Sequence, residues 1–123
     1  TAVDEALDAT VEFLLSRDPA VADYPMGYGN TKPNGSWFKP GFPSGYVTDV
    51  LQNMEVLGEL GVAADPRLDH AHEWLVGLAD ARGRWKNRYA YTGKTTVKIE
   101  KRGDQSKWVT LRACKVLRAR HGN

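Results

Sequence analysis

The chain has 123 residues, of which 41% are hydrophobic and 26% are charged, so it is long enough to bury one core. No apolar run approaches the roughly 20 residues that a membrane span requires, and the first residues lack the pattern of a signal peptide. The single cysteine, Cys114, excludes an internal disulfide framework, and its place in an apolar helical pattern predicts a buried thiol. We expect one cytoplasmic domain over residues 1–123, cut from a longer parent because the chain does not begin with Met.

The net charge of +2 conceals an uneven distribution along the chain. Residues 1–82 hold 5 Lys/Arg and 13 Asp/Glu, a net −8, whereas residues 83–123 hold 12 Lys/Arg and 2 Asp/Glu, a net +10. We expect the two halves to neutralise each other or to face an acidic partner. The alternative is a surface that binds nucleic acid.

The first half of the chain predicts two helices separated by a long loop. Residues 4–17 carry one apolar stripe at helical spacing, formed by Val3, Leu7, Val11 and Leu14. Residues 18–43 contain nine Pro and Gly residues, which break regular structure, and aromatic side chains that could pin the loop onto the helices. A second helix is predicted over residues 44–60, with Gly61 as its stop.

The second half predicts two more helices and one extended arm. Asp65 suits an N-cap, Pro66 the first helical position and Gly83 the residue after the end, which predicts a third helix between them. Residues 95–100 alternate apolar and polar side chains, which predicts one short strand or a small hairpin arm. The last helix is predicted over residues 106–121.

A degenerate repeat links the two halves. Phe13-Leu14 is followed by Gly35-Ser36-Trp37, and Trp74-Leu75 is followed by Gly83-Arg84-Trp85. An aromatic-Leu pair on a helix followed by Gly-x-Trp resembles the QW repeat of squalene-hopene cyclases, although Asp18 and Ala79 stand where that family has Gln. With residues 42–49 and 106–113 included, nearly the whole chain resembles uncharacterised bacterial proteins grouped with prenyltransferase-like and cyclase-like toroids.

This resemblance implies a mainly α fold, an arc of an α/α-toroid built from two αα-hairpin units. The first unit covers residues 1–61 with the inserted loop, and the second covers residues 62–123. Each unit cannot bury its apolar face alone. We therefore expect the open flanks of the arc to be covered by the rest of a longer parent chain or by another copy in a homo-oligomer.

The catalytic parts of that superfamily are missing from the sequence. There is no Asp-x-Asp-Asp segment and no Asp, Cys and His set for zinc, so neither a metal nor another cofactor is predicted. His70 and His72 are two residues apart, which places them about 200° apart around a helix and prevents them from sharing one ion. Asp49, early in an apolar helix, is the one candidate acid or base. Its alternative roles are to cap that helix or to pair with a basic residue such as Lys107.

Two further sets of residues could form binding sites. An aromatic set could line a pocket for an apolar, isoprenoid-like ligand, or could simply be core: Trp37, Tyr46, Trp85, Tyr89, Tyr91 and Trp108. A basic set lies in the aromatic-rich segment 83–123 and could hold phosphates: Lys98, Lys101, Arg102 and Lys107.

The sequence therefore predicts a toroid-like helical domain without a catalytic site of its own, which binds an apolar ligand or completes a larger barrel. The alternative is a module that binds nucleic acid through residues 83–123. A cyclase or prenyltransferase subunit completed by another chain is a third hypothesis.

Overall fold

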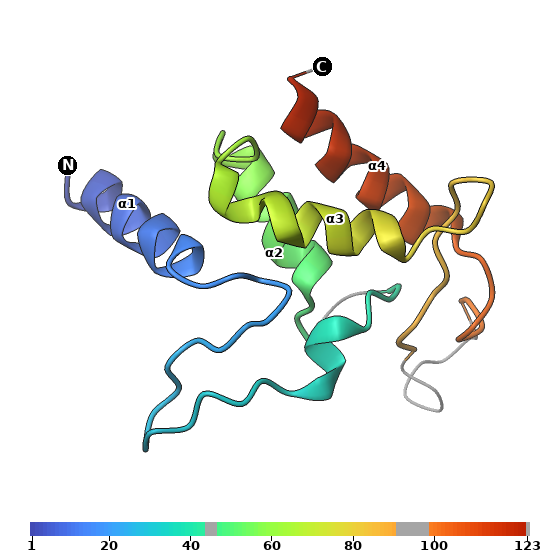
Figure 1. Ribbon diagram of the computed structural model, residues 1–123, viewed down its shortest axis with the longest axis horizontal. Coiled ribbons are helices and arrows are strands. Elements are labelled where there is room, and N and C mark those ends of the chain that lie inside the picture. Colours follow the sequence, from blue (N-terminus) through green and yellow to red (C-terminus); the bar gives the residue numbers. More distant parts are fainter. Residues whose placement is uncertain (44–46, 91–98, 123) are drawn as a thin grey trace.

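A computed structural model of the chain describes residues 1–43, 47–90 and 99–122. It is mainly helical, with four α-helices and two short 3₁₀-helices, η1 and η2, in the described ranges. In Figure 1, α1 stands at one end of the molecule and α4 at the other, with α2 and α3 between them. The prediction of a mainly α chain with four helices is confirmed, while its arrangement as part of a toroid stays a prediction.

Helix α1 spans Ala2–Leu15 and begins two residues earlier than predicted. Thr1 and Asp4 form a capping box, which satisfies amide groups that would otherwise lack partners at the helix start. Leu15 is the one buried residue of this helix. Most of the predicted apolar stripe is therefore only partly covered.

Helix α2 spans Val50–Glu59 rather than 44–60. It starts late because Asp49 is its N-cap, with extended backbone and a side chain that accepts from the amide of Gln52. Residues 44–46 of the predicted helix lie outside the described ranges. Gly61 follows the helix end with a φ of +83°, as predicted for a stop that needs a left-handed residue.

The third helical segment consists of η2, Pro66–Leu68, and α3, Asp69–Gly77. Asp65 caps η2 and Pro66 is its first residue, as predicted. The predicted continuation toward Gly83 is wrong, because Asp80 closes a turn in which its carboxylate accepts the amides of Arg82 and Arg84. Gly83, with a φ of +70°, belongs to that turn rather than to the end of a helix.

Helix α4 spans Lys107–His121 and matches its predicted bounds closely. Ser106 caps its start, and Gly122 ends it in the left-handed conformation. Its last turn carries Arg118, Arg120 and His121, the charge sign that a helix C-terminus favours. The thiol of Cys114 is exposed, so the predicted burial of that side chain is wrong.

The loop between α1 and α2 is ordered around η1, Gly35–Phe38. The indole of Trp37 donates a 2.8 Å hydrogen bond to the carbonyl of Pro19, which holds both ends of the loop together. The predicted strand falls largely on residues outside the described ranges, and Ile99 and Glu100, which are described, have no strand structure. Nearby, Lys86 and Gln105 form an isolated antiparallel bridge.

The core lies where α3 and α4 meet α2. Its buried members include Leu51 and Met54 of α2, Leu75 of α3, and Val109 and Ala113 of α4. Helices α2 and α4 form the most extensive helix pair. A second, smaller cluster joins Leu15, Leu57 and Leu68 at the other side of α2. None of the helices in the described ranges is both long and apolar enough to cross a lipid bilayer.

Candidate functional site

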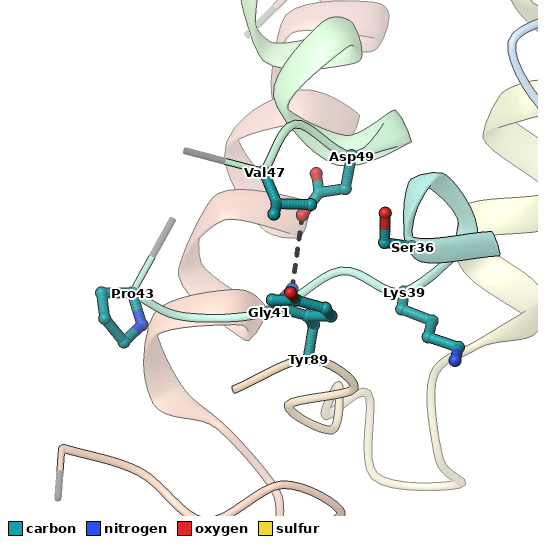
Figure 2. A pocket seen from close by; sticks show the side chains of 7 residues that line it. All are labelled: Ser36, Lys39, Gly41, Pro43, Val47, Asp49 and Tyr89. Atoms are coloured by element: carbon teal, nitrogen blue, oxygen red, sulfur yellow. Dashed lines mark hydrogen bonds between the residues drawn. The ribbon is translucent and has the colours of Figure 1, made fainter. Parts of the chain in front are cut away.

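Asp49, the candidate acid or base, is buried at the start of α2. Its side chain accepts from the amide of Gln52 at 2.9 Å. It also accepts from the amide of Gly41 at 3.4 Å (Figure 2). Burial raises the pKa of its carboxyl group, while these hydrogen bonds and Arg112 act in the opposite direction. The capping role is the one that the geometry displays.

Arg112 of α4 holds the surroundings of Asp49 together. Its guanidinium pairs with Glu55, donates to the Gly41 carbonyl at 2.9 Å and lies 3.9 Å from the Asp49 carboxylate. Lys107, the partner suggested by the sequence, instead lies 5.1 Å above the Trp108 ring. The cavity beside Asp49 measures about 10 Å³, which is room for about one water molecule. Among the described residues, this cavity is too small for a substrate larger than a water molecule.

Gly41 and Asn87 hold together the backbone segments next to Asp49. A Cβ atom on Gly41 would lie 2.1 Å from the Tyr89 carbonyl oxygen, so this close approach of two backbones requires glycine. Asn87 is fully buried, and its amide donates to the Phe42 carbonyl at 2.7 Å and to Glu100 at 3.1 Å. Sequence reasoning missed Asn87 because its partners lie 13 and 45 residues away along the chain.

The described members of the aromatic set lie in different places. Trp85 is 4% exposed in the core, and Trp108 stacks on Phe42 with ring centroids 5.4 Å apart. Tyr89 lines the cavity beside Asp49, and Trp37 lines a separate hollow. Tyr46 and Tyr91 lie outside the described ranges.

The hollow at Trp37 is the larger and more apolar of these two spaces. It measures about 240 Å³, and its walls include Tyr24, Met26, Pro33 and Trp37 from the long loop, with Thr48 before α2. The polar ends of Tyr24 and Trp37 are already bonded to backbone carbonyl groups, which fixes the ring positions. This hollow can accommodate a small apolar group.

The basic and histidine residues do not gather into one site. Lys101 and Arg102 are exposed beside the turn at Gly103, Lys107 is exposed at the start of α4, and Lys98 lies outside the described ranges. His70 pairs with Asp18, and His72 is buried with its Nε2 3.1 Å from the Ala63 carbonyl. In the parts of the chain that the structure describes, no group of three metal-ligating side chains occurs. Nucleic-acid binding stays a prediction.

The internal repeat has a different register from the one that the sequence motif suggested. The Trp85 indole donates to the carbonyl of Leu75, ten residues earlier, and the Tyr24 hydroxyl donates to the carbonyl of Leu14, also ten residues earlier. These two pairs are separated by 61 residues, like the motifs Glu12-Phe13-Leu14 and Glu73-Trp74-Leu75. Tyr24, rather than Trp37, is therefore the structural counterpart of Trp85.

The turns that follow the two motifs support this register. Ala22, with a φ of +54°, stands 61 residues before Gly83, with a φ of +70°. Burial raises the pKa of Tyr24 to about 12, so its hydroxyl stays a donor. A search for Gly-x-Trp missed this copy because alanine takes the left-handed position and tyrosine replaces tryptophan. The spacing of 61 was the signal that could have revealed it.

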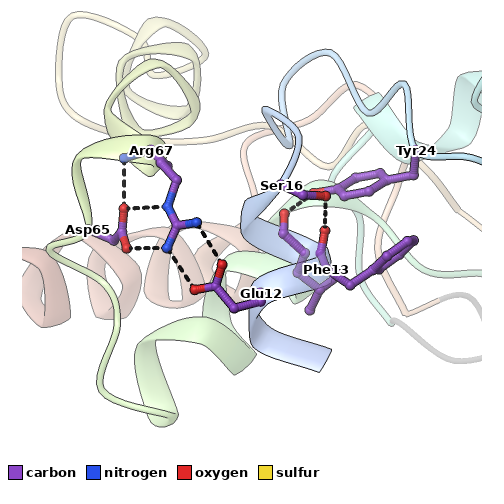
Figure 3. A network of polar contacts seen from close by, with 7 residues as sticks. Glu12, Phe13, Ser16, Tyr24, Asp65 and Arg67 are labelled. Atoms are coloured by element: carbon purple, nitrogen blue, oxygen red, sulfur yellow. Dashed lines mark hydrogen bonds and ion pairs between the residues drawn. The ribbon is translucent and has the colours of Figure 1, made fainter. Parts of the chain in front are cut away.

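One junction between consecutive units is visible around Arg67 (Figure 3). Its guanidinium bonds Glu12 of α1 at 3.0 and 3.1 Å and Asp65 at 3.0 Å. These bonds hold the pKa of the Glu12 carboxyl below its usual value. Beneath the ion pair, Leu68 packs between Leu15 and Leu57. The start of η2 thus seals the groove between α1 and α2.

Comparisons of the chain with protein-family models, with curated proteins and with solved structures each gave no match.

Proposed function

We propose that the chain is a two-unit segment of an α/α-toroid-like helical array, and that it acts as an interaction module without a catalytic site of its own. The observation that carries the proposal is a difference between equivalent positions of the two units. Leu68, before α3, is 1% exposed, while Leu7 on α1 is 43% exposed. Ala71 and Leu75 are fully buried, whereas the positions 61 residues earlier, Thr10 and Leu14, are exposed and partly buried.

This difference has a simple structural reason. Ala71 and Leu75 of α3 belong to the main core cluster, which also holds residues of α2 and α4, whereas α1 contributes only to the smaller cluster with Leu57 of α2 and Leu68 of η2. In a repeat array, stability is approximately the sum of unit stabilities and of the contacts between neighbours. Helix α1 carries the residues of a repeat helix but buries only Leu15, so it presents a face on which another helical unit can pack.

A tandem chain that carries the 123 residues twice tests this function. The copies would be joined by the native loop sequence 60–65, so that α4 of the first copy precedes α1 of the second. We expect a higher urea midpoint than for the single chain, because the internal α1 gains a neighbour. Leu7→Lys in the second copy should remove much of the gain, while the same change in the first copy, where α1 stays open, should not.

Equal midpoints for the single and tandem chains would contradict the interaction role. Turnover of an isoprenoid diphosphate or a linear triterpene by the purified chain would contradict the absence of a catalytic site. The cavity of about 10 Å³ beside Asp49 is the observation that disfavours such turnover.

The hollow at Trp37 favours a second candidate function, binding of a short isoprenoid-like ligand. Its volume of about 240 Å³ is below the usual range for drug-sized ligands, so a single short prenyl group is the expected occupant. Geraniol should quench tryptophan fluorescence on binding. Met26→Lys, at the wall of the hollow, should abolish that quenching, whereas Val21→Lys, an exposed control on the same loop, should leave it unchanged. Identical titrations for the two variants would exclude this site.

A further inference from the structure

A hollow of about 380 Å³ opens between α3 and the C-terminal end of α4. Its apolar surface comes from Val76 of α3, which is 51% exposed, and from Leu117 of α4. Glu73 and Arg120 line it as well. It is therefore an apolar depression with charged residues beside it, the composition of a contact surface between proteins.

The counterpart of this hollow in the first unit is already filled. There, Leu15 of α1, Leu57 of α2 and Leu68 of η2 form one buried cluster. A shift of 61 residues places Val76 at the position of Leu15, whereas the counterpart of Leu57 is Arg118, the neighbour of the hollow residue Leu117. The residue that corresponds to Leu68, 61 residues earlier, is Leu7.

We propose that Leu7 of a second copy of this chain fills the hollow between α3 and α4, so that copies associate head to tail. This inference rests on the proposed function and names the partner of the open α1. Leu7 is available for this contact because 43% of its surface is exposed. Helix α1, which carries Leu7, lies on one side of the molecule, and α4, which lines the hollow together with α3, lies on the other (Figure 1).

Charge complementarity selects a second copy as the occupant. Helix α1 carries four acidic residues and no Lys or Arg: Asp4, Glu5, Asp8 and Glu12. Helix α4 carries five Lys or Arg residues and no acidic residue: Lys107, Arg112, Lys115, Arg118 and Arg120. Two of these pair within the chain, Arg112 with Glu55 and Arg120 with Asp69. Opposite charges on the two ends favour the contact of one end with the other over the contact of two like ends. A head-to-tail contact is heterologous, so it continues into open chains or closes into a ring.

The filled junction also fixes the register of the proposed contact. There, Arg67 bonds Glu12 across the groove. The counterpart of Glu12 is Glu73, beside the open hollow, and the counterpart of Arg67 is Ala6. The proposed contact therefore lacks one ion pair that a single substitution, Ala6→Arg, would add.

Two complementary variants test the contact by analytical ultracentrifugation of the full chain. Leu7→Lys disables the inserted residue, and Val76→Glu disables the receiving hollow. Both side chains are about half exposed, so circular dichroism should show unchanged folding. Wild type should grow in mean mass with concentration and less so at high salt. Each variant alone should associate at least about tenfold more weakly.

An equal mixture of the two variants should restore association, because each mixture partner keeps the surface that the other has lost. The mixed complex should stop at one copy of each, since its outer surfaces are both disabled. A misfolded variant could not produce this rescue. Wild-type chains that stay monomeric, variants that still self-associate, or a mixture without a complex would each overturn the inference.

Ala6→Arg tests the register independently of any loss of folding. It should tighten wild-type association about two- to fivefold, the range of an exposed ion pair, and Glu73→Gln in the same chain should cancel the gain. Asp8→Arg places a positive charge on the opposite side of α1, about 200° from Ala6, and its effect should not depend on Glu73. A gain that survives Glu73→Gln would overturn the register. If free chains stay monomeric while the tandem chain is stabilised, the second copy is wrong as the partner and the proposed function still holds.

Discussion

Leu75 of α3 and Leu14 of α1 stand at equivalent positions of two similar helices, yet their surroundings differ. Leu75 is completely buried in the core cluster that α3 shares with α2 and α4, whereas Leu14 is partly exposed beside a smaller cluster. Both carbonyl groups accept a hydrogen bond from an aromatic side chain ten residues later. The hydrogen bond from an aromatic side chain to a leucine carbonyl thus occurs in both segments, whereas the packing of other helices against the leucine does not. The turn of each unit forms locally, while burial of its helix requires a unit on each side.

The largest expected difference between the units concerns these two leucines. Leu75→Ala should lower the free energy of unfolding by about 3 kcal/mol, because the cavity lies in a fully packed core. Leu14→Ala should lower it by about 1 kcal/mol, because part of that side chain already contacts water. Urea unfolding of both variants measures the comparison. Equal losses would mean that α1 is covered as well as α3.

A smaller difference is expected for the two aromatic hydrogen bonds. Trp85→Phe leaves the Leu75 carbonyl without its donor inside the core and should lower the free energy of unfolding by about 2 kcal/mol. Tyr24→Phe should lower it by about 0.5–1 kcal/mol, because water can reach the end of α1. Thermal unfolding of the pair measures this difference. A larger loss of unfolding free energy for Tyr24→Phe would mean that the Tyr24 hydrogen bond stabilises the fold more than the Trp85 hydrogen bond does.

The smallest effects should come from two carboxylates whose pKa shifts have opposite signs. Burial raises the pKa of Asp49, so its ionisation opposes folding as the pH rises through the folded-state pKa. Asp49→Asn, which keeps a capping side chain, should therefore be at least as stable as wild type at neutral pH. That advantage should fade below about pH 4, where the unfolded carboxyl is also protonated.

Glu12 should behave in the opposite way. Arg67 lowers its pKa, so its stabilising contribution is present at neutral pH and is lost as the pH falls through the folded-state pKa. Glu12→Gln should be slightly less stable than wild type at neutral pH and equal to it in acid. Urea midpoints measured from neutral pH to about pH 3 check both carboxylates. Parallel pH profiles for the two variants would contradict these assignments.

The residues that begin and end several of the helices were predictable from the sequence. Asp65 and Ser106 cap helical segments as expected, and Gly61 follows a helix in the left-handed conformation, because these residue types satisfy or permit the geometry of a helix end by themselves. The early end of α3 was not predicted, because it depends on which of several acidic residues closes a turn. Asp80 does so with the amides of Arg82 and Arg84.

The candidate site was less predictable, because its parts come from distant segments. Asp49 was found, but its partner Arg112 lies 63 residues later on α4, and only packing of α2 against α4 brings them together. Asn87 gives no sequence signal, since its role depends on the backbone of residue 42. The similarity between the segments around Tyr24 and Trp85 was not apparent in the sequence, because Ala22 and Tyr24 stand where a Gly-x-Trp motif would have glycine and tryptophan.

Native-state hydrogen exchange tests most directly whether α1 is a repeat helix without its neighbour. The comparison is between amides of residues 6–14 in α1 and amides 61 residues later, in the dilute single chain. Local opening should expose α1 far more often than α3, so its amides should exchange about a hundredfold faster, and they should become protected as the chain concentration rises. Equal protection of the two segments at every concentration would contradict the account.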